Sequence, residues 1–253
     1  MKKIILFLVA TTVTASMLYA QDTTEMNHEM AKTKKRQNLI KLNLLALPLK
    51  SITVQYERQI GKKTTVGLTL RDMPSTGLPF KNSIRNAITD STTLNQIDNF
   101  KMSNFALMPE IRFYLGRKGA YHGFYIAPFF SYAHYTADLP FSYDDNGTNK
   151  TIPLSGSINT ITGGLMFGAQ WKLAKSLYLD LWLFGPHYGS SKGSISGKQS
   201  LSTSEQSSLK SSLDDLNIPL VNTTNTVDAN GATLNFSGPW AGIRSGLCIG
   251  FRF

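Results

Sequence analysis

Apolar and polar residues alternate with a period of two through most of the chain after residue 38. Between residues 52 and 60, Val54 and Tyr56 share one parity, while Gln55 and Glu57 share the other. This period predicts β-strands with one apolar and one polar face. Several of the segments are about ten residues long, the length with which a tilted strand crosses a bilayer. The signal occurs in eight segments, of which 121–135 is apolar or aromatic on both faces: 39–49, 52–60, 64–72, 104–115, 121–135, 160–173, 177–184 and 240–253.

The connections between these strands alternate between short and long. In an up-and-down barrel this order sends every long connection to one end, as in outer-membrane barrels with short periplasmic turns and longer extracellular loops. We therefore predict an all-β, eight-stranded antiparallel up-and-down transmembrane β-barrel with long extracellular loops and both termini on the periplasmic side. Besides a tight first link near Lys50, the short connections are 61–63, 116–120 and 174–176, and the long polar ones are 73–103, 136–159 and 188–239.

The polar parity of the strands carries charges of both signs. Acyl chains satisfy an apolar sheet face but not open backbone edges, so the sheet must close with its polar face inside. An eight-stranded lumen is filled mostly by side chains, and buried charges must be paired. We expect an internal ion-pair network rather than a selectivity ring, a proton pathway or a ligand site. Its members are Lys41, Glu57, Arg71, Glu110, Arg112, Asp180, Arg244 and Arg252. The alternative is a soluble β-sandwich or lipocalin-like barrel with its apolar face inward.

The N-terminus has the layout of a cleaved export signal. Lys2 and Lys3 precede an apolar core at residues 4–10, and Ala20 precedes a polar stretch. This layout is typical of a secretory signal peptide. We assign three segments: residues 1–20 to the signal peptide, 21–37 to a flexible periplasmic lead and 38–253 to the barrel.

Composition limits the chemistry available to the chain. Charged residues make up only 17% of it, which is low for a soluble domain. The formal net charge is +10, or +8 without Lys2 and Lys3. The basic residues are dispersed on a chain expected to be exported, so no nucleic-acid partner is expected. Cys248 is the single cysteine and the four histidines lack ligand spacing, so we predict no metal and no cofactor.

The C-terminus ends in an alternating apolar pattern with a terminal aromatic residue. Ile249, Phe251 and Phe253 resemble the signal by which outer-membrane barrels engage the assembly machinery. The segments NLIKLNLLALPLKSITVQYER (38–58), LDLWLFGP (179–186) and GIRSG (242–246) resemble a family of small outer-membrane barrels of unknown function from Bacteroidetes-type bacteria. In architecture these are similar to OmpA/OmpX-type eight-stranded barrels. The resemblance spans most of residues 38–253. It implies a fold and a location in the outer membrane of a Gram-negative bacterium, and no chemistry.

The last long connection contains a helix signal. Ser202–Glu205 fits a capping box. Leu209, Leu213 and Leu216 then fall on one helical stripe, and Pro219 ends it. Ile84 and Ile88 indicate a weaker helical turn in the first long connection. Such helices would form a lid over the barrel mouth, a surface for a partner, or a locally ordered loop without a partner.

We predict that the protein is not an enzyme. His134 and His187 stand at expected extracellular strand ends, but neither has a nucleophile and an orienting acid at a suitable spacing. The expected role in the cell envelope is structural or interactive. Its expected partners are outer-membrane lipids and lipopolysaccharide, the assembly machinery, and an extracellular protein bound through the loops. The alternatives are a narrow pore or transporter-like channel, and a lipid-modifying outer-membrane enzyme.

Overall fold

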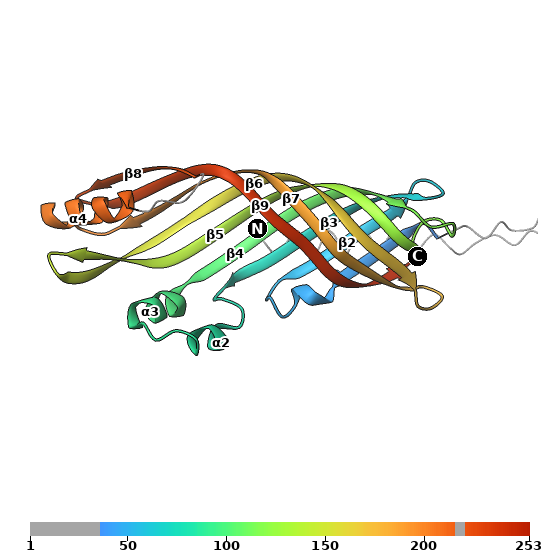
Figure 1. Ribbon diagram of the computed structural model, residues 1–253, viewed down its shortest axis with the longest axis horizontal. Coiled ribbons are helices and arrows are strands. Elements are labelled where there is room, and N and C mark those ends of the chain that lie inside the picture. Colours follow the sequence, from blue (N-terminus) through green and yellow to red (C-terminus); the bar gives the residue numbers. More distant parts are fainter. Residues whose placement is uncertain (1–35, 216–220) are drawn as a thin grey trace, which may run out of the picture. The chain divides into compact units, whose positions relative to one another are not determined.

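A computed structural model describes residues 36–215 and 221–253 (Figure 1). The assigned signal peptide, most of the assigned lead, and Leu216 and Pro219 of the helix signal lie outside the described residues. The described residues contain one sheet of nine strands, three α-helices and one short 3-10 helix.

The strands follow one another around a closed ring. β1 to β7 pair antiparallel in succession, and β9 pairs with both β7 and β1, which closes the ring with eight strands. The predicted fold class, an all-β antiparallel up-and-down barrel, is confirmed. The ring strands are β1 (Asn38–Asn43), β2 (Ile52–Gln59), β3 (Thr64–Thr76), β4 (Lys101–Tyr114), β5 (Gly123–Asp145), β6 (Thr148–Lys172), β7 (Leu177–Lys198) and β9 (Gly231–Arg252).

Side chains alternate between the interior of the ring and its outer surface. In β1, Lys41 is buried while Ile40 is exposed. In β2, Gln55 and Glu57 are buried while Tyr56 is exposed. The polar parity therefore faces inward, as the sequence predicts. Every ring strand turns large apolar side chains outward, including Ile40, Ile52, Leu68, Phe105, Phe130, Ile161, Leu183 and Phe251.

The short turns and both ends of the barrel chain gather at one end of the ring, here called the short-turn end. The N–H of Asn38 donates to the carbonyl of Phe253 at 3.1 Å, and the N–H of Phe253 donates to the carbonyl of Asn38 at 2.9 Å. These bonds close the seam between β1 and β9. The turns at this end are 60–63, 115–122 and 173–176.

Two of the three predicted long loops contain long strands instead. β5 and β6 continue through 136–159 to a tight turn at Asn146 and Gly147, whose φ values of 54° and 83° suit a two-residue hairpin. β7 and β9 cover 188–198 and 231–239 at the two ends of the other segment, and β8 (Asn222–Asp228) pairs with the outer part of β9. We call the described residues of 136–159 and 188–239 the extension. The prediction was wrong because polar and turn-forming residues are frequent in these segments, whereas the backbone pairing continues through them.

The connection from β3 to β4 is a loop with two short helices. α2 (Lys81–Arg85) contains Ile84 of the weak helical signal, but Ile88 lies beyond its end, and α3 (Ser91–Asn99) was not predicted. Lys81 and Arg85 both form ion pairs with Asp98 of α3, at 2.9 and 2.6 Å. These two ion pairs link the helices to each other.

The helix predicted in the extension is confirmed. α4 (Thr203–Asp214) begins after Ser202, and the side chains of Ser202 and Glu205 form the expected capping box. Leu209 and Leu213 of α4 are fully buried. They belong to a small hydrophobic core of the extension that also contains Tyr143, Ile152, Leu154, Leu201 and Ala232. Burial of this stripe docks α4 against the strands of the extension, near β8 (Figure 1).

Lys150 joins the β5–β6 hairpin to α4. Its Nζ lies 2.7 Å from Oε1 of Glu205 and 3.1 Å from Oδ2 of Asp145. The hydrogen bond from Lys150, together with bonds from Ser202, lowers the pKa of Glu205 to about 2 from its ordinary 4.5. A carboxyl whose pKa is depressed stabilises the folded state above its ordinary pKa, and this stabilisation is lost as the pH falls through the folded value.

We predict that α4 stays fully docked above about pH 4.5 and loosens progressively as the pH falls from there toward 2. Hydrogen-exchange protection factors of its amides should be equal at pH 7 and pH 5.5 and should then decline, because protonated Glu205 no longer binds Lys150. In the Lys150→Met variant the protection should be lower at pH 7 and the decline on acidification should be smaller, because the pKa of the carboxyl then lies nearer its ordinary value. A wild-type helix that has already lost its protection at pH 4 would contradict this coupling.

Candidate functional site in the barrel lumen

Lys41 of β1 reaches across the lumen to carboxylates on two other strands. Its Nζ lies 2.5 Å from Oε2 of Glu57 on β2 and 2.6 Å from Oδ2 of Asp180 on β7. All three side chains are buried. Alternation places each of them on the inward face of its strand, and ring closure brings the three strands within reach of one ammonium group.

Arg112 of β4 occupies the centre of this cluster and is fully buried. Its Nη1 lies 2.6 Å from Oδ2 of Asp180 and 3.5 Å from Oε2 of Glu57, and its Nε pairs with Glu110. Its Nη2 donates to the side-chain oxygen of Gln55 at 2.8 Å. The planar guanidinium therefore uses its donors in several directions, which suits arginine better than lysine at this position.

Arg244 of β9 completes the set of charges. Its Nη1 lies 2.6 Å from Oε2 of Glu110, and its Nη2 donates to the hydroxyl of Thr69 at 2.9 Å. The guanidinium also stacks 4.2 Å from the ring centroid of Trp182. Three cations and three carboxylates now form one connected group, here called the ionic network, whose formal charges cancel. Its members are Lys41, Glu57, Glu110, Arg112, Asp180 and Arg244.

Uncharged side chains satisfy the remaining acceptors of the ionic network. The hydroxyl of Tyr125 donates to Asp180 at 2.8 Å, and the indole N–H of Trp182 donates to the same carboxylate at 3.0 Å. The hydroxyl of Tyr114 lies 2.7 Å from Oε1 of Glu57. Gly168 makes room for Tyr125, since a Cβ there would lie 2.3 Å from the tyrosine oxygen. The network and these aromatic rings together fill this cross-section of the lumen.

Six of the eight charged residues predicted for the lumenal network are brought together, and two are not. Arg252 lies toward the short-turn end, where it stacks 4.5 Å from the ring of Tyr121 and donates to the hydroxyl of Tyr178 at 2.9 Å. Arg71 lies on the other side of the network and donates to the hydroxyl of Tyr135 at 3.3 Å. Alternation gives the face on which a residue lies but not its height along the barrel, and these two arginines sit at other heights.

Sequence reasoning missed the uncharged members of the cluster. Tyr114 shares the parity of Glu110 and Arg112, so its inward position could have been predicted from the sequence. Tyr125 lies in a segment that is apolar on both faces, and no signal in that segment distinguishes its inner side. Gln170 lies within hydrogen-bond distance of Tyr114, at 2.6 Å.

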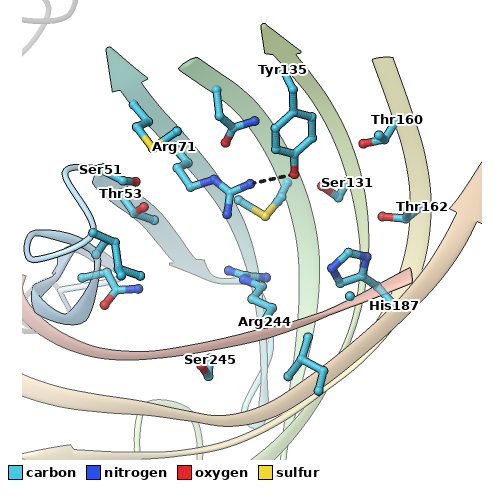
Figure 2. A pocket seen from close by; sticks show the side chains of 18 of the residues that line it. Ser51, Thr53, Arg71, Ser131, Tyr135, Thr160, Thr162, His187, Arg244 and Ser245 are labelled. Carbon is cyan, nitrogen blue, oxygen red and sulfur yellow. Dashed lines mark hydrogen bonds between the residues drawn. The ribbon is translucent and has the colours of Figure 1, made fainter. Parts of the chain in front are cut away.

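A cavity of about 600 Å³ lies on the far side of the ionic network from the short turns. Figure 2 shows side chains that line it. Arg71, Arg244 and His187 point into it, with hydroxyl residues of several strands around them. Neither aspartate nor glutamate is among the described residues that line it. Asn43 and Asn104 also line it, and most of the remaining wall is apolar, with contributions from Leu45, Leu49, Met73, Met102, Met108, Phe129 and Trp240.

The two histidines considered as catalytic candidates lie on opposite faces of the barrel wall. His187 lines the cavity, where Gly242 leaves room for its ring: a Cβ on Gly242 would lie 2.7 Å from the imidazole Nε2. His134 shares the outward parity of β5, and its Nδ1 lies 2.8 Å from the side-chain oxygen of Asn159. The structure does not bring them together. In the described part of the chain, histidine, cysteine and acidic residues form no group able to hold a metal ion.

The residues of the predicted assembly signal share the outward parity of β9. Phe251 and Phe253 are about half exposed, and Ile249 is partly exposed on the same face. Ile249 and Phe251 lie in the seam with β1, opposite Leu42 and Ile40. No helix of the described residues is long and apolar enough to span a membrane.

Comparison with known proteins gives a family match and several solved structures, among them two of low similarity. A family model described as a protein of unknown function (DUF3575) matches residues 6–188. The translocator domain of the autotransporter NalP from Neisseria meningitidis is 12% identical with a TM-score of 0.35, over 96% of this chain and 93% of that one. The N-terminal β-barrel domain of Pseudomonas aeruginosa OprF is 8% identical with a TM-score of 0.25, over 86% and 98%. Both TM-scores are low, so neither likeness carries an argument. Among curated proteins there is no match.

We predict that Asp180→Asn strongly destabilises the barrel. It removes one of three carboxylates and leaves one buried cation unbalanced, so the free energy of unfolding should fall by about 3–5 kcal/mol. Urea-induced unfolding in lipid vesicles, followed by tryptophan fluorescence, measures this loss. The matched control is Asp98→Asn, which weakens the partly exposed ion pairs with Lys81 and Arg85 and should cost at most about 1 kcal/mol. Equal, small losses in both variants would show that charge balance in the lumen is unimportant.

Proposed function

The chain belongs to the DUF3575 family of proteins of unknown function, and we propose that it is an integral outer-membrane β-barrel with a lumen closed to ions. In this proposal the barrel has no transport role. It anchors the extension outside the bilayer, where the extension serves a structural or interactive purpose.

The outer surface of the ring supports a place in a membrane. Large apolar side chains stand exposed on all eight ring strands, far beyond the scattered apolar residues of a soluble surface. The six charged side chains of the ionic network face inward instead. A soluble lipocalin-like barrel needs the opposite arrangement, with its apolar face packed inside. Because ring closure pairs the strand edges, acyl chains around the barrel would meet no open backbone.

The arrangement of the two ends supports an orientation. In outer-membrane barrels the short turns are periplasmic and the longer elements are extracellular. The short-turn end of this ring holds both ends of the barrel chain, so we place it in the periplasm and the extension outside the cell. An export signal at 1–20 fits transport into the periplasm. An assembly signal at Ile249, Phe251 and Phe253 fits insertion into the outer membrane, with the assembly machinery as a transient partner. Origin in a Bacteroidetes-type Gram-negative bacterium is part of the proposal.

The ionic network is the observation that best supports a lumen closed to ions. A conducting pore needs hydrated space along its axis, whereas here six charges pair with one another and aromatic rings fill the gaps between them. An eight-stranded interior is just wide enough for side chains to fill it. The arrangement favours a closed barrel over the narrow-pore alternative.

The build of the extension favours an interactive role over a passive one. Its strands are held by continuous backbone pairing, and α4 is docked by a hydrophobic core and by the bridge through Lys150. An ordered platform of this kind presents one fixed surface, which lowers the entropic cost of binding a partner. We propose an extracellular protein or lipopolysaccharide as that partner, and no catalytic role for His134 or His187.

We predict that the wild-type protein shows no steady conductance in a planar lipid bilayer. The double variant Lys41→Ala/Glu57→Ala removes two side chains of the ionic network and keeps its charges balanced, so it should open measurable steps of current. The matched control is Lys150→Ala/Glu205→Ala, which removes a similar pair from the extension and should stay closed. Steady wild-type currents as large as those of the lumenal double variant would favour the pore instead.

A further inference from the structure

The ionic network leaves out two of the predicted lumenal arginines, Arg71 and Arg252, and of these Arg71 is the one that lines the cavity. The six charges of the network cancel, and Arg71 has no carboxylate within ion-pair distance among the described residues. Its one hydrogen bond to a described side chain goes to the hydroxyl of Tyr135, at 3.3 Å. Its guanidinium points into the cavity beside Arg244 (Figure 2). A charge that faces a partly enclosed space without a counter-charge favours an anion there.

Unpartnered polar atoms gather at the same cavity. Seven buried side-chain atoms of the described residues lack a hydrogen-bond partner in the protein, and four of them belong to residues that line this space. Three of the four are nitrogens on side chains that point into the cavity (Figure 2). Arg244 and Ser51 are themselves more than nine-tenths buried. The four atoms are Oγ of Ser51, Nε of Arg71, Nδ1 of His187 and Nε of Arg244.

Most of the wall surface is apolar, with further hydroxyl and amide groups such as those of Asn43 and Asn104, and the space has the size of a small-molecule site. The volume of about 600 Å³ lies within the range of about 300–1,000 Å³ that is usual for such sites. Met73, Met102 and Trp240 supply flexible and aromatic surface on one side, and Leu45 and Leu49 supply more. Apolar walls with a few convergent polar groups are typical of sites for organic ligands rather than for bare inorganic ions.

We propose that this cavity binds a small organic anion with a single carboxylate and an apolar body. One surplus cation calls for one negative charge, and the guanidinium of Arg71 matches a carboxylate geometrically. The hydroxyl of Ser51 and the imidazole of His187 supply further hydrogen bonds, and the apolar body packs against the methionines and Trp240. The ionic network closes the lumen on the periplasmic side, so the ligand enters from the extension side and leaves the same way. The site is a receptor pocket. Binding of the ligand there does not depend on whether the extension binds a partner.

The test uses the methionine methyl groups as local reporters. Met73, Met102 and Met108 line the cavity, whereas Met166 is fully buried in the aromatic cluster of the barrel interior and does not line it. The full chain, labelled with carbon-13 at the methionine methyls and placed in lipid nanodiscs, is titrated with 3-phenylpropanoate. The neutral analogue 3-phenylpropan-1-ol is titrated in parallel. We expect saturable shifts of the three cavity methyls with the acid, little change at Met166, and at least about tenfold weaker binding of the alcohol.

Variants identify the charge responsible. Arg71→Gln should weaken binding of the acid at least about tenfold without changing the weak binding of the alcohol, and Arg71→Lys should retain part of the affinity. The matched control is Arg117→Gln, at an exposed arginine in a turn of the short-turn end, and it should bind like the wild type. A shift in mobility on heating in detergent shows that each variant has folded.

Several outcomes would overturn the proposal. Unperturbed cavity methyls at saturating acid would mean that the space holds only solvent. Equal affinity for acid and alcohol would mean a purely apolar pocket, and this comparison needs no variant. Shifts of Met166 as large as those of the cavity methyls would indicate unspecific partitioning. A folded Arg71→Gln protein with wild-type affinity would exclude Arg71 as the anion-binding group. None of these results bears on the conductance of the barrel.

Discussion

Charge balance inside the lumen is the constraint on which the rest of this structure depends. Three carboxylates and three cations from five strands meet in a space without room for much water, and each must find its partner there. An unpaired ion in such a place costs several kcal/mol, so the register of every contributing strand is tied to that of the others. Asp180 shows this dependence most clearly, because it accepts from Lys41, Arg112, Tyr125 and Trp182 at once.

The inward position of the charges determines what the outer surface must be. Side chains of a strand alternate, so a row of lysine, glutamate and arginine on one face leaves leucine, isoleucine and phenylalanine on the other. Along the barrel this gives an apolar belt around a polar, neutral interior. Beyond the belt the same strands are richer in serine, threonine and asparagine. Their apolar residues, such as Tyr143 and Ile152, pack with Leu209 and Leu213 of α4 in a small hydrophobic core that stabilises the extension.

The sequence predicts the ring well because alternation is a local property, visible in segments such as 52–60. The capping box at Ser202 is equally local, and α4 begins where it indicates. Properties that depend on distant contacts were not predictable. The heights of Arg71 and Arg252 along the barrel depend on strand register around the ring. The sequence does not reveal that Tyr125 faces the lumen, because its neighbours on both faces of the strand are apolar. The strands of the extension were missed because polar residues outnumber apolar ones there. The alternation of Phe141 and Tyr143 and the Asn146-Gly147 turn nevertheless mark a hairpin.

The most direct test of this account compares two neighbouring residues on β7. Trp182 is 2% exposed and faces the lumen, whereas Leu183 is 49% exposed on the outer surface. Single-tryptophan proteins, with tryptophan either at Trp182 or introduced by Leu183→Trp and the other tryptophans replaced by phenylalanine, are placed in vesicles of lipids with brominated acyl chains. The account predicts strong quenching for Leu183→Trp and weak quenching for Trp182. Stronger quenching of Trp182 than of its neighbour would mean that the faces are reversed, and the membrane barrel described here would be wrong.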